Sequence, residues 1–271
     1  MTASASAPAA DGSMPYWERK LAVLMSEKRI VTPYPHRRES KKAQVGRMFD
    51  RIAPRYDFLN RLLSLGIDVY WRRRALRYLG GADKPALLLD VATGTADVAL
   101  LAARLFRPCR VIGIDIAPQM LELGRQKIRR KGWEAFIRLE EGDAEQLPFE
   151  DHTFDAVTVA FGVRNFENLE KGLSEICRVL RPGGRVVVLE FSRPTATPFK
   201  QLYYAYFKYV LPLVGRLTSR DPHAYTYLFE SVQSFPQGND FLNILAQTGY
   251  QHLQCERLTF GICSVYTGVK A

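Results

Sequence analysis

Cysteine and histidine are scarce in this sequence, and both are widely scattered. Cys109, Cys177, Cys255 and Cys263 include no Cys-x-x-Cys pair, and the four histidines stand at no metal-ligand spacing from them. Disulfide frameworks and structural zinc sites both need closely grouped ligands. The pattern therefore favours a protein of the reducing cytoplasm, without a disulfide framework and without a metal site.

Long apolar runs are also missing. The most apolar long stretch, residues 199–217, is interrupted by Lys200, Lys208, Pro212 and Arg216, which excludes an ordinary membrane-spanning helix. Residues 1–13 lack the basic start and apolar run of a signal peptide, and their composition is typical of a disordered tail. We expect neither integral membrane insertion nor secretion.

Positive charge, by contrast, is concentrated near the N-terminus. Up to position 85 there are 17 Lys and Arg against 8 Asp and Glu, whereas the remainder carries 21 against 20. Such an arm attracts anionic lipid headgroups or nucleic acid. It is equally a solvated basic face that aids solubility, and composition does not choose between these interpretations.

The length and composition favour one core. A chain of 271 residues with 47% hydrophobic residues accommodates a single large α/β domain with additions. Residues 16–30 have the spacing of a short amphipathic helix, and residues 36–42 read as a basic linker. We therefore expect a disordered tail and basic amphipathic arm over residues 1–42, and one domain over residues 43–271.

Strand and helix patterns alternate along that domain. The expected strands are residues 86–91, 110–114, 137–140, 156–160 and 185–190, with helices such as 120–130 and 169–180 between them. Such alternation predicts an α/β fold with a mostly parallel, doubly wound, Rossmann-like sheet. Residues 251–258 and 263–269 read as a closing antiparallel hairpin, and helical patterns over residues 49–79 predict an N-terminal helical extension.

The ends of the first two strands suggest a nucleoside ligand. The first strand runs through Asp90 into a turn containing Gly94, whose backbone is able to approach a ligand closely. The next strand ends at Asp115, some twenty residues on, where a carboxylate accepts hydrogen bonds from two ribose hydroxyls. Together they predict a cofactor site at this edge of the sheet.

Further motifs narrow the cofactor. The turn lacks the Gly-x-Gly-x-x-Gly pattern of dinucleotide sites, and the third strand leads into Asp143 and Ala144, placed to contact adenine. Residues 147–149, 154–157 and 178–184 follow in an order that resembles class I S-adenosylmethionine-dependent methyltransferases. The resemblance implies S-adenosylmethionine as cofactor. One departure is Ala96, where these proteins usually have Gly; Ala is tolerable there if its φ is negative.

A more specific resemblance covers residues 45–271. The stretches 49–60, 64–68, 71–73, 161–166, 189–192, 225–231 and 235–236 resemble the C-methyltransferases of menaquinone and ubiquinone biosynthesis. By that resemblance the cofactor contacts fall on Thr95, Asp115, Asp143 and Ala144, beside Asp90 and Gly94. The implied partner is a lipophilic demethylmenaquinol, methylated on a ring carbon, and a homodimer is an open possibility.

The implied chemistry needs a group that favours phenolate, because an ionised hydroxyl makes the neighbouring ring carbon more nucleophilic. Arg164 follows the fourth strand and is able to stabilise phenolate or orient a water that takes the proton. The alternative for Arg164 is a surface salt bridge. Tyr56 and Asn165 are candidates for orienting the ring hydroxyls, although Tyr56 is equally interpreted as a core aromatic.

The aromatic residues from Tyr203 to Tyr209 suggest a lid for an isoprenoid tail that touches the membrane interface, or else an ordinary packed helix. The first interpretation predicts a cytoplasmic protein peripheral to the inner face of an anionic membrane. Residues 64–68 and 71–73 favour demethylmenaquinone over a ubiquinone precursor. RNA methylation and a non-catalytic scaffold are the rival functions, and we expect no nucleic-acid partner.

Overall fold

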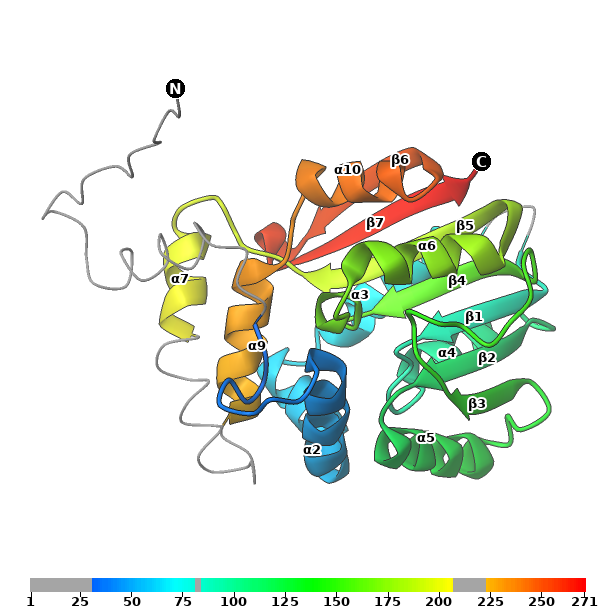
Figure 1. Ribbon diagram of the computed structural model, residues 1–271, viewed down its shortest axis with the longest axis horizontal. Coiled ribbons are helices and arrows are strands. Elements are labelled where there is room, and N and C mark those ends of the chain that lie inside the picture. The colour runs from blue at the N-terminus through cyan, green and yellow to red at the C-terminus, as the bar shows by residue number, and fades with distance from the viewer. Residues whose placement is uncertain (1–30, 81–83, 207–222) are drawn as a thin grey trace, which may run out of the picture. The chain divides into compact units, whose positions relative to one another are not determined.

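The central element is a seven-stranded sheet, seen in a computed structural model that describes residues 31–80, 84–206 and 223–271 (Figure 1). Its order is β3-β2-β1-β4-β5-β7-β6. The first five strands run parallel, and β7 is antiparallel to both β5 and β6. The strands are β1 (Leu87–Val91), β2 (Arg110–Asp115), β3 (Ile137–Glu141), β4 (Phe154–Ala160), β5 (Leu180–Phe191), β6 (Tyr250–Leu258) and β7 (Cys263–Lys270).

Helices connect these strands and precede them. They are α2 (Lys41–Leu63), α3 (Asp68–Arg77), α4 (Asp97–Leu105), α5 (Pro118–Lys131), α6 (Leu169–Val179), α7 (Phe199–Ala205), α9 (His223–Ser234) and α10 (Asn239–Gln247), with 3-10 turns η1 (Val163–Asn165) and η3 (Thr259–Gly261). The predicted parallel sheet, closing hairpin and N-terminal helical extension are confirmed.

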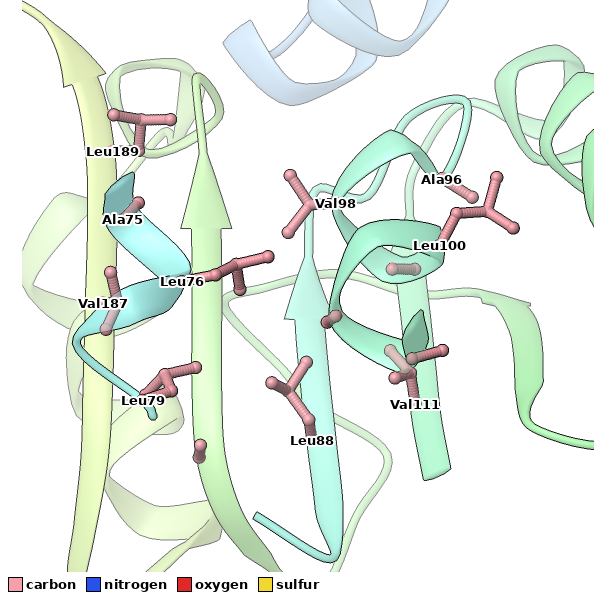
Figure 2. Packing of buried hydrophobic residues seen from close by; sticks show 14 of the residues in the cluster. Ala75, Leu76, Leu79, Leu88, Ala96, Val98, Leu100, Val111, Val187 and Leu189 are labelled. Carbon is pink, nitrogen blue, oxygen red and sulfur yellow. The ribbon is translucent and has the colours of Figure 1, made fainter. Parts of the chain in front are cut away.

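Both faces of the sheet are covered, because alternate residues of each strand point to opposite sides. On one face Leu88 of β1 and Val187 of β5 pack against α3 and α4, as Figure 2 shows. On the other face Leu89 and Val188 pack with α6 and α10. Strands buried on both faces are nearly continuous apolar runs, which explains why the sequence pattern located them well.

Helix α2 lies beside the helices that follow the strand ends. Ser40 caps it by accepting a hydrogen bond from the backbone N–H of Ala43 (3.2 Å). Lys41 and Lys42 therefore form its first turn, so the predicted linker 36–42 was too long by two residues. Further along, Ala53 packs with Met120 of α5, and Val45 and Met48 pack with α9. In Figure 1, α2, α7 and α9 lie beyond the ends to which the arrows of β4 and β5 point.

The turn after β1 has an unusual backbone. Ala92, Gly94 and Ala96 have φ values of 54°, 56° and 65°, in the left-handed region that favours glycine. The condition placed on Ala96, a negative φ, is therefore wrong. Ala96 is fully buried at the N-terminus of α4, and a left-handed alanine costs about 1 kcal/mol. The turn stores this strain where the backbone must bend sharply out of the sheet.

Two expectations fall wholly or partly outside the described residues. The amphipathic helix over residues 16–30 lies outside them, as do Phe207 and Tyr209 of the aromatic cluster. Within the described ranges, no helix is both long and apolar enough to cross a membrane. The division of the chain at residue 42 stays a prediction.

Candidate functional site

The carboxyl ends of β1 to β4 meet at one edge of the sheet, and two adjoining cavities open there. We call them the strand-end cavity and the polar cavity; Tyr56, Ala92, Gly94, Ala160 and Phe161 line both. The strand-end cavity is also lined by Lys42, Asp115, Asp143, Ala144 and Asn165. The polar cavity is also lined by Arg72, Asp90, Thr93, Thr95 and Asp97. The strand order reverses between β1 and β4, which is where open α/β sheets bind ligands.

Asp115 lies at the end of β2 with its carboxylate held by backbone amides. Oδ2 accepts from the N–H of Gly94 (2.8 Å) and Oδ1 from the N–H of Ala117 (3.0 Å). A carboxylate has about four acceptor positions, so Asp115 keeps spare acceptor capacity beside these amides. Burial raises the pKa of Asp115 to about 6, more than the amide hydrogen bonds lower it. A buried carboxylate with spare acceptor capacity suits a pair of hydroxyl donors.

Asp90 and Thr95 line the polar cavity but are already engaged in the protein. Asp90 accepts hydrogen bonds from the hydroxyls of Thr93 and Thr158, each at 2.6 Å, and burial raises its pKa to about 6. The hydroxyl of Thr95 donates to Asp57 (2.6 Å) and accepts from Lys127 (2.8 Å). Both side chains therefore fix the turn after β1 as well as face the cavity.

Asp143 and Ala144 follow β3 at the far side of the strand-end cavity. One carboxylate oxygen of Asp143 accepts from the N–H of Glu145 (3.0 Å), which closes the turn. The other oxygen forms an ion pair with Lys42 of α2. Ala144 is buried and supplies an apolar wall. Helix α2 thus contributes to the wall of this cavity, and the ion pair of Lys42 with Asp143 connects it to the segment after β3.

A third cavity, the apolar cavity, has a volume of about 270 Å³. It adjoins the polar cavity, because Tyr56, Arg72 and Phe161 line both. Its other lining residues include Trp71, Arg164, Phe191, Phe199, Leu202 and Tyr203. The aromatic cluster thus contributes to its wall, at least through the residues of α7. An apolar chamber joined to a polar one suits a ligand with a ring and an apolar tail.

Arg164, from η1, is buried in the wall of the apolar cavity. Its Nη1 donates to Glu190 (2.7 Å) and to the carbonyl oxygen of Phe161 (2.6 Å). The Arg164 and Glu190 side chains are 6% and 0% exposed, so the alternative of a surface salt bridge is wrong. Arg164 Nε is also buried and has no hydrogen-bond partner within the described part of the chain. A buried donor without a partner indicates a ligand or water site.

Tyr56 and Asn165 occupy different places. Tyr56 lines all three cavities, and burial raises the pKa of its phenol. Asn165 lines the strand-end cavity, where its side-chain oxygen accepts from the hydroxyl of Tyr227 (3.1 Å). Tyr56 thus lies where the cavities join. Asn165 lies on the strand-end side, away from the apolar cavity.

Sequence reasoning missed three charged residues of the site, namely Lys42, Arg72 and Glu190. Lys42 pairs with Asp143, Glu190 pairs with Arg164, and Arg72 lines two cavities. Glu190 and Arg72 stand in stretches that resemble family motifs, which was a usable signal. Burial on a strand or helix face depends on packing, however, and three consecutive arginines do not reveal which one points inward.

The aromatic residues that an RNA-binding face would need are employed elsewhere. Trp71 is buried and its indole N–H donates to the hydroxyl of Thr259 (2.7 Å). The phenol of Tyr78 donates to Glu256 (2.8 Å), which leaves Tyr70 as the exposed ring of the three. Across the described ranges, no group of three or more His, Cys, Asp or Glu residues is arranged to hold a metal ion.

Solved structures with this fold include proteins of different function. The chain superimposes on the cyclase SpnF with a TM-score of 0.62 and 18% identity, covering 84% of this chain and 96% of that one. A Thermotoga maritima protein described as an S-adenosylmethionine-dependent methyltransferase gives a TM-score of 0.60 and 16% identity, covering 83% and 99%. At such identities the likeness shows the fold alone.

Sequence relatives are much closer. The demethylmenaquinone methyltransferase of Bacteroides fragilis is 47% identical over 237 residues, which are 87% of this chain and 96% of that protein. The Geotalea daltonii protein named ubiquinone/menaquinone biosynthesis C-methyltransferase UbiE is 48% identical over 231 residues, or 85% and 97% of the two chains. Residues 37–270 match the ubiE/COQ5 methyltransferase family. The chain therefore belongs to that family and is a methyltransferase.

Proposed function

We propose that this protein transfers a methyl group from S-adenosylmethionine to a ring carbon of demethylmenaquinol, giving menaquinol. The observation that carries the proposal is that the strand-end cavity and the polar cavity are joined to the apolar cavity through Tyr56 and Phe161, which line all three. The names of the relatives from Bacteroides fragilis and Geotalea daltonii point to the same substrate class.

The donors and acceptors at the strand ends fit S-adenosylmethionine. Asp115 offers two carboxylate oxygens to the ribose hydroxyls, and Asp143 and Ala144 flank the space for adenine. Gly94 lines both the strand-end cavity and the polar cavity, and its missing side chain allows the backbone to approach the ligand. Asp90 and Thr95 line the polar cavity, which would hold the amino-acid end of the cofactor. When bound, this cofactor supplies an electrophilic methyl group on a sulfonium.

Arg164 is the residue that we assign to ring activation. Arg164 lines the apolar cavity and its buried Nε has no partner in the described part of the chain, so a ring oxygen or a water bound there would accept from it. A guanidinium in this apolar setting favours phenolate over phenol. Glu190 holds the other side of Arg164 and fixes its direction. Tyr56, at the junction of the cavities, orients the ring toward the cofactor side. Asn165, which ends η1, accepts a hydrogen bond from Tyr227 and so ties η1 to α9.

Direct turnover tests the proposal. Purified protein is incubated with S-adenosylmethionine and either reduced short-tailed demethylmenaquinone or a reduced ubiquinone precursor, and products are identified by mass spectrometry. We expect methylation of the naphthoquinol ring. Methylation of the benzoquinol alone would move the protein to ubiquinone synthesis. Binding of S-adenosylmethionine without methylation of either ring would favour the scaffold interpretation.

The same proposal includes contact with a membrane surface, because the substrate is lipophilic. Exposed apolar side chains surround the apolar cavity: Leu65 is 81% exposed and Leu202 is 68% exposed, and both also line it. Phe260, 64% exposed, stacks on Phe199 of the cavity wall at 3.7 Å between ring centroids. Side chains of this kind at a mouth suit the interfacial region of a bilayer.

Vesicle sedimentation tests this contact. If the basic arm also takes part, binding to anionic vesicles exceeds binding to neutral ones and falls as salt rises. Leu202→Ser should weaken binding, whereas Leu105→Ser serves as the matched control, because Leu105 is an exposed leucine at the distant end of α4. Equal losses in both variants, or salt-independent binding to both vesicle types, would contradict the assignment.

A further inference from the structure

The polar cavity contains one cationic side chain whose role the proposed function leaves open. Its described lining includes the carboxylates of Asp90 and Asp97, and Arg72 as its single cation. Arg72 lies on α3, outside the strand ends that hold the rest of the cofactor site, and is 8% exposed. A buried guanidinium needs a compensating negative charge, and a buried anion that enters the cavity needs a compensating positive charge.

The position of Arg72 is fixed from two sides. Its Nη1 pairs with Asp68 one turn earlier on α3 and lies 3.7 Å from Oδ2 of Asp97. Its guanidinium carbon lies 5.7 Å from the centroid of the Phe161 ring. Among the described residues, the hydrogen bond and ion pairs of Arg72 with Asp68 and Asp97 all use Nη1. Guanidinium has five N–H donors, so this side chain is held in place with donors to spare.

The direction of the proposed cofactor brings an anion to this cation. With adenosine between Asp115 and Asp143, the rest of the molecule extends past Gly94 into the polar cavity. That end is an amino acid, with one carboxylate and one ammonium group. Asp90 and Asp97 are the carboxylates near this end, Asp97 being paired with Lys127 (2.7 Å); they suit the ammonium group better than the carboxylate. Arg72 is the complementary partner for the carboxylate.

We propose that Arg72 binds the carboxylate of the amino-acid end of S-adenosylmethionine. The proposal rests on the proposed function, and it adds a contact from the N-terminal helices to those of the strand ends. Arg72 also lines the apolar cavity. The contact would therefore hold the cofactor at the wall between the polar cavity and the apolar cavity.

Calorimetry with two ligands isolates this contact. The probes are S-adenosylhomocysteine and its decarboxylated analogue, which retains the adenosine and the amine. We expect the wild-type protein to prefer the carboxylated ligand by roughly 10-fold to 100-fold, the usual range for a hydrogen bond to a charged group. In Arg72→Gln the preference should fall close to one, through loss of affinity for S-adenosylhomocysteine alone. Arg72→Lys should keep part of the preference.

Matched variants separate binding from folding. Arg72→Gln removes one of the two arginines that pair with buried Asp68, the other being Arg61 (3.1 Å), so Asp68→Asn combined with Arg72→Gln is measured beside it. Arg74→Gln on the same helix removes a cation that pairs with Glu256 on β6, and it should leave the preference unchanged.

Three outcomes would overturn the proposal. An unchanged preference in Arg72→Gln would assign the carboxylate to another group. Equal weakening of both ligands would make Arg72 structural. If the wild-type protein bound neither ligand, or if Asp115→Ala left the binding of both ligands unchanged, the cofactor site itself would be overturned. If the preference for S-adenosylhomocysteine depended on Asp115 but not on Arg72, the proposed function would stand and only the role of Arg72 would fall.

Discussion

The strand-end half of the site and the helix-built half are constructed in opposite ways. At the strand ends, Asp90 lies one residue before the end of β1 and Asp115 ends the adjacent strand β2, and both are held by short hydrogen bonds to neighbouring backbone or hydroxyl groups. The apolar cavity is instead enclosed by side chains from α2, α3, α7 and the segments after β4 and β5. One half is local to a rigid sheet, and the other joins segments far apart in the chain.

This difference indicates that charged and polar groups determine binding at the strand ends, whereas apolar packing determines it in the apolar cavity. In the proposed function, polar groups at the strand ends bind the ribose hydroxyls of S-adenosylmethionine. The aromatic walls of the apolar cavity would accept the substrate ring with less directional demand. Among the described residues of that apolar wall, Arg164 and Arg72 are the cations, and each is held by an acidic partner, Glu190 and Asp68 respectively. Changes in the two halves should therefore affect different measured quantities.

The largest expected effect belongs to Arg164, on the substrate side. Arg164→Ala removes a hydrogen bond that becomes stronger as the ring oxygen gains charge. The single-turnover rate of methylation should therefore fall roughly 100-fold to 1000-fold. S-Adenosylmethionine affinity, measured in parallel by calorimetry, should change little. Raising the pH should restore part of the rate, because solution then supplies more phenolate. Arg164→Lys should rescue the rate only in part, since a point charge lacks the planar fork.

Loss of the buried partner complicates this variant, because Glu190 is 0% exposed and pairs with Arg164. The double variant Arg164→Ala with Glu190→Gln removes both charges and serves as the folding control. Near-normal turnover in the double variant would reduce Arg164 to a structural residue. Lost cofactor affinity with an unchanged rate at saturation would place it in the cofactor half.

Asp115→Ala should produce the largest effect on cofactor affinity. Two charge-assisted hydrogen bonds to the ribose are lost, so S-adenosylmethionine affinity should fall roughly a hundredfold. Asp115→Asn should be milder, because its amide oxygen still accepts one hydrogen bond. Calorimetry that finds unchanged affinity in Asp115→Ala would contradict the assignment of this strand end and remove the distinction between the two halves.

Cofactor affinity should also depend on pH through the raised pKa of Asp115, about 6. The ionised carboxylate is the form that accepts two ribose hydroxyls, so affinity should fall as the pH drops below about 6, by up to roughly tenfold per pH unit. Titration calorimetry between about pH 5 and pH 7 measures this slope. Asp115→Asn should flatten it, and an equal slope in that variant would assign the titration to Asp90, whose pKa is also about 6.

The same shift acts on stability with the opposite sign. Without ligand, the folded protein holds the Asp115 proton more tightly than the unfolded chain, whose Asp pKa is about 3.9. The contribution of Asp115 to the free energy of unfolding should therefore decline as the pH rises from about 4 to about 6, which a comparison of wild type with Asp115→Asn in urea denaturation measures. Bound cofactor should offset this decline.

The smallest expected effect concerns the backbone of the strand-end half. Ala96→Gly relieves a left-handed alanine, so the free energy of unfolding should rise by about 1 kcal/mol. Urea denaturation measures this change in the free energy of unfolding, provided that the dependence of that free energy on urea concentration is the same in both proteins. Ala99→Gly, a buried position inside α4, is the control and should lower stability by about 1 kcal/mol or more. A loss of stability in Ala96→Gly would mean that packing of the methyl group outweighs the strain.

The sequence by itself determined the parallel sheet, the closing hairpin and the positions of Asp90, Asp115 and Asp143 at strand ends. The physical reason is periodicity: a strand buried on both faces is a continuous apolar run, and the residue that ends it lies at the binding edge. Asp115 needed no knowledge of its neighbours to be placed there.

Only the tertiary structure decided which charged residues meet. It turned Arg72 inward and left Arg73 exposed on the same helix, and it buried Arg164 against Glu190, twenty-six residues away. It also gave Ala96 a positive φ, which the turn imposes and the residue type disfavours. Such pairings depend on how distant segments pack, and neither local spacing nor residue type contains that information.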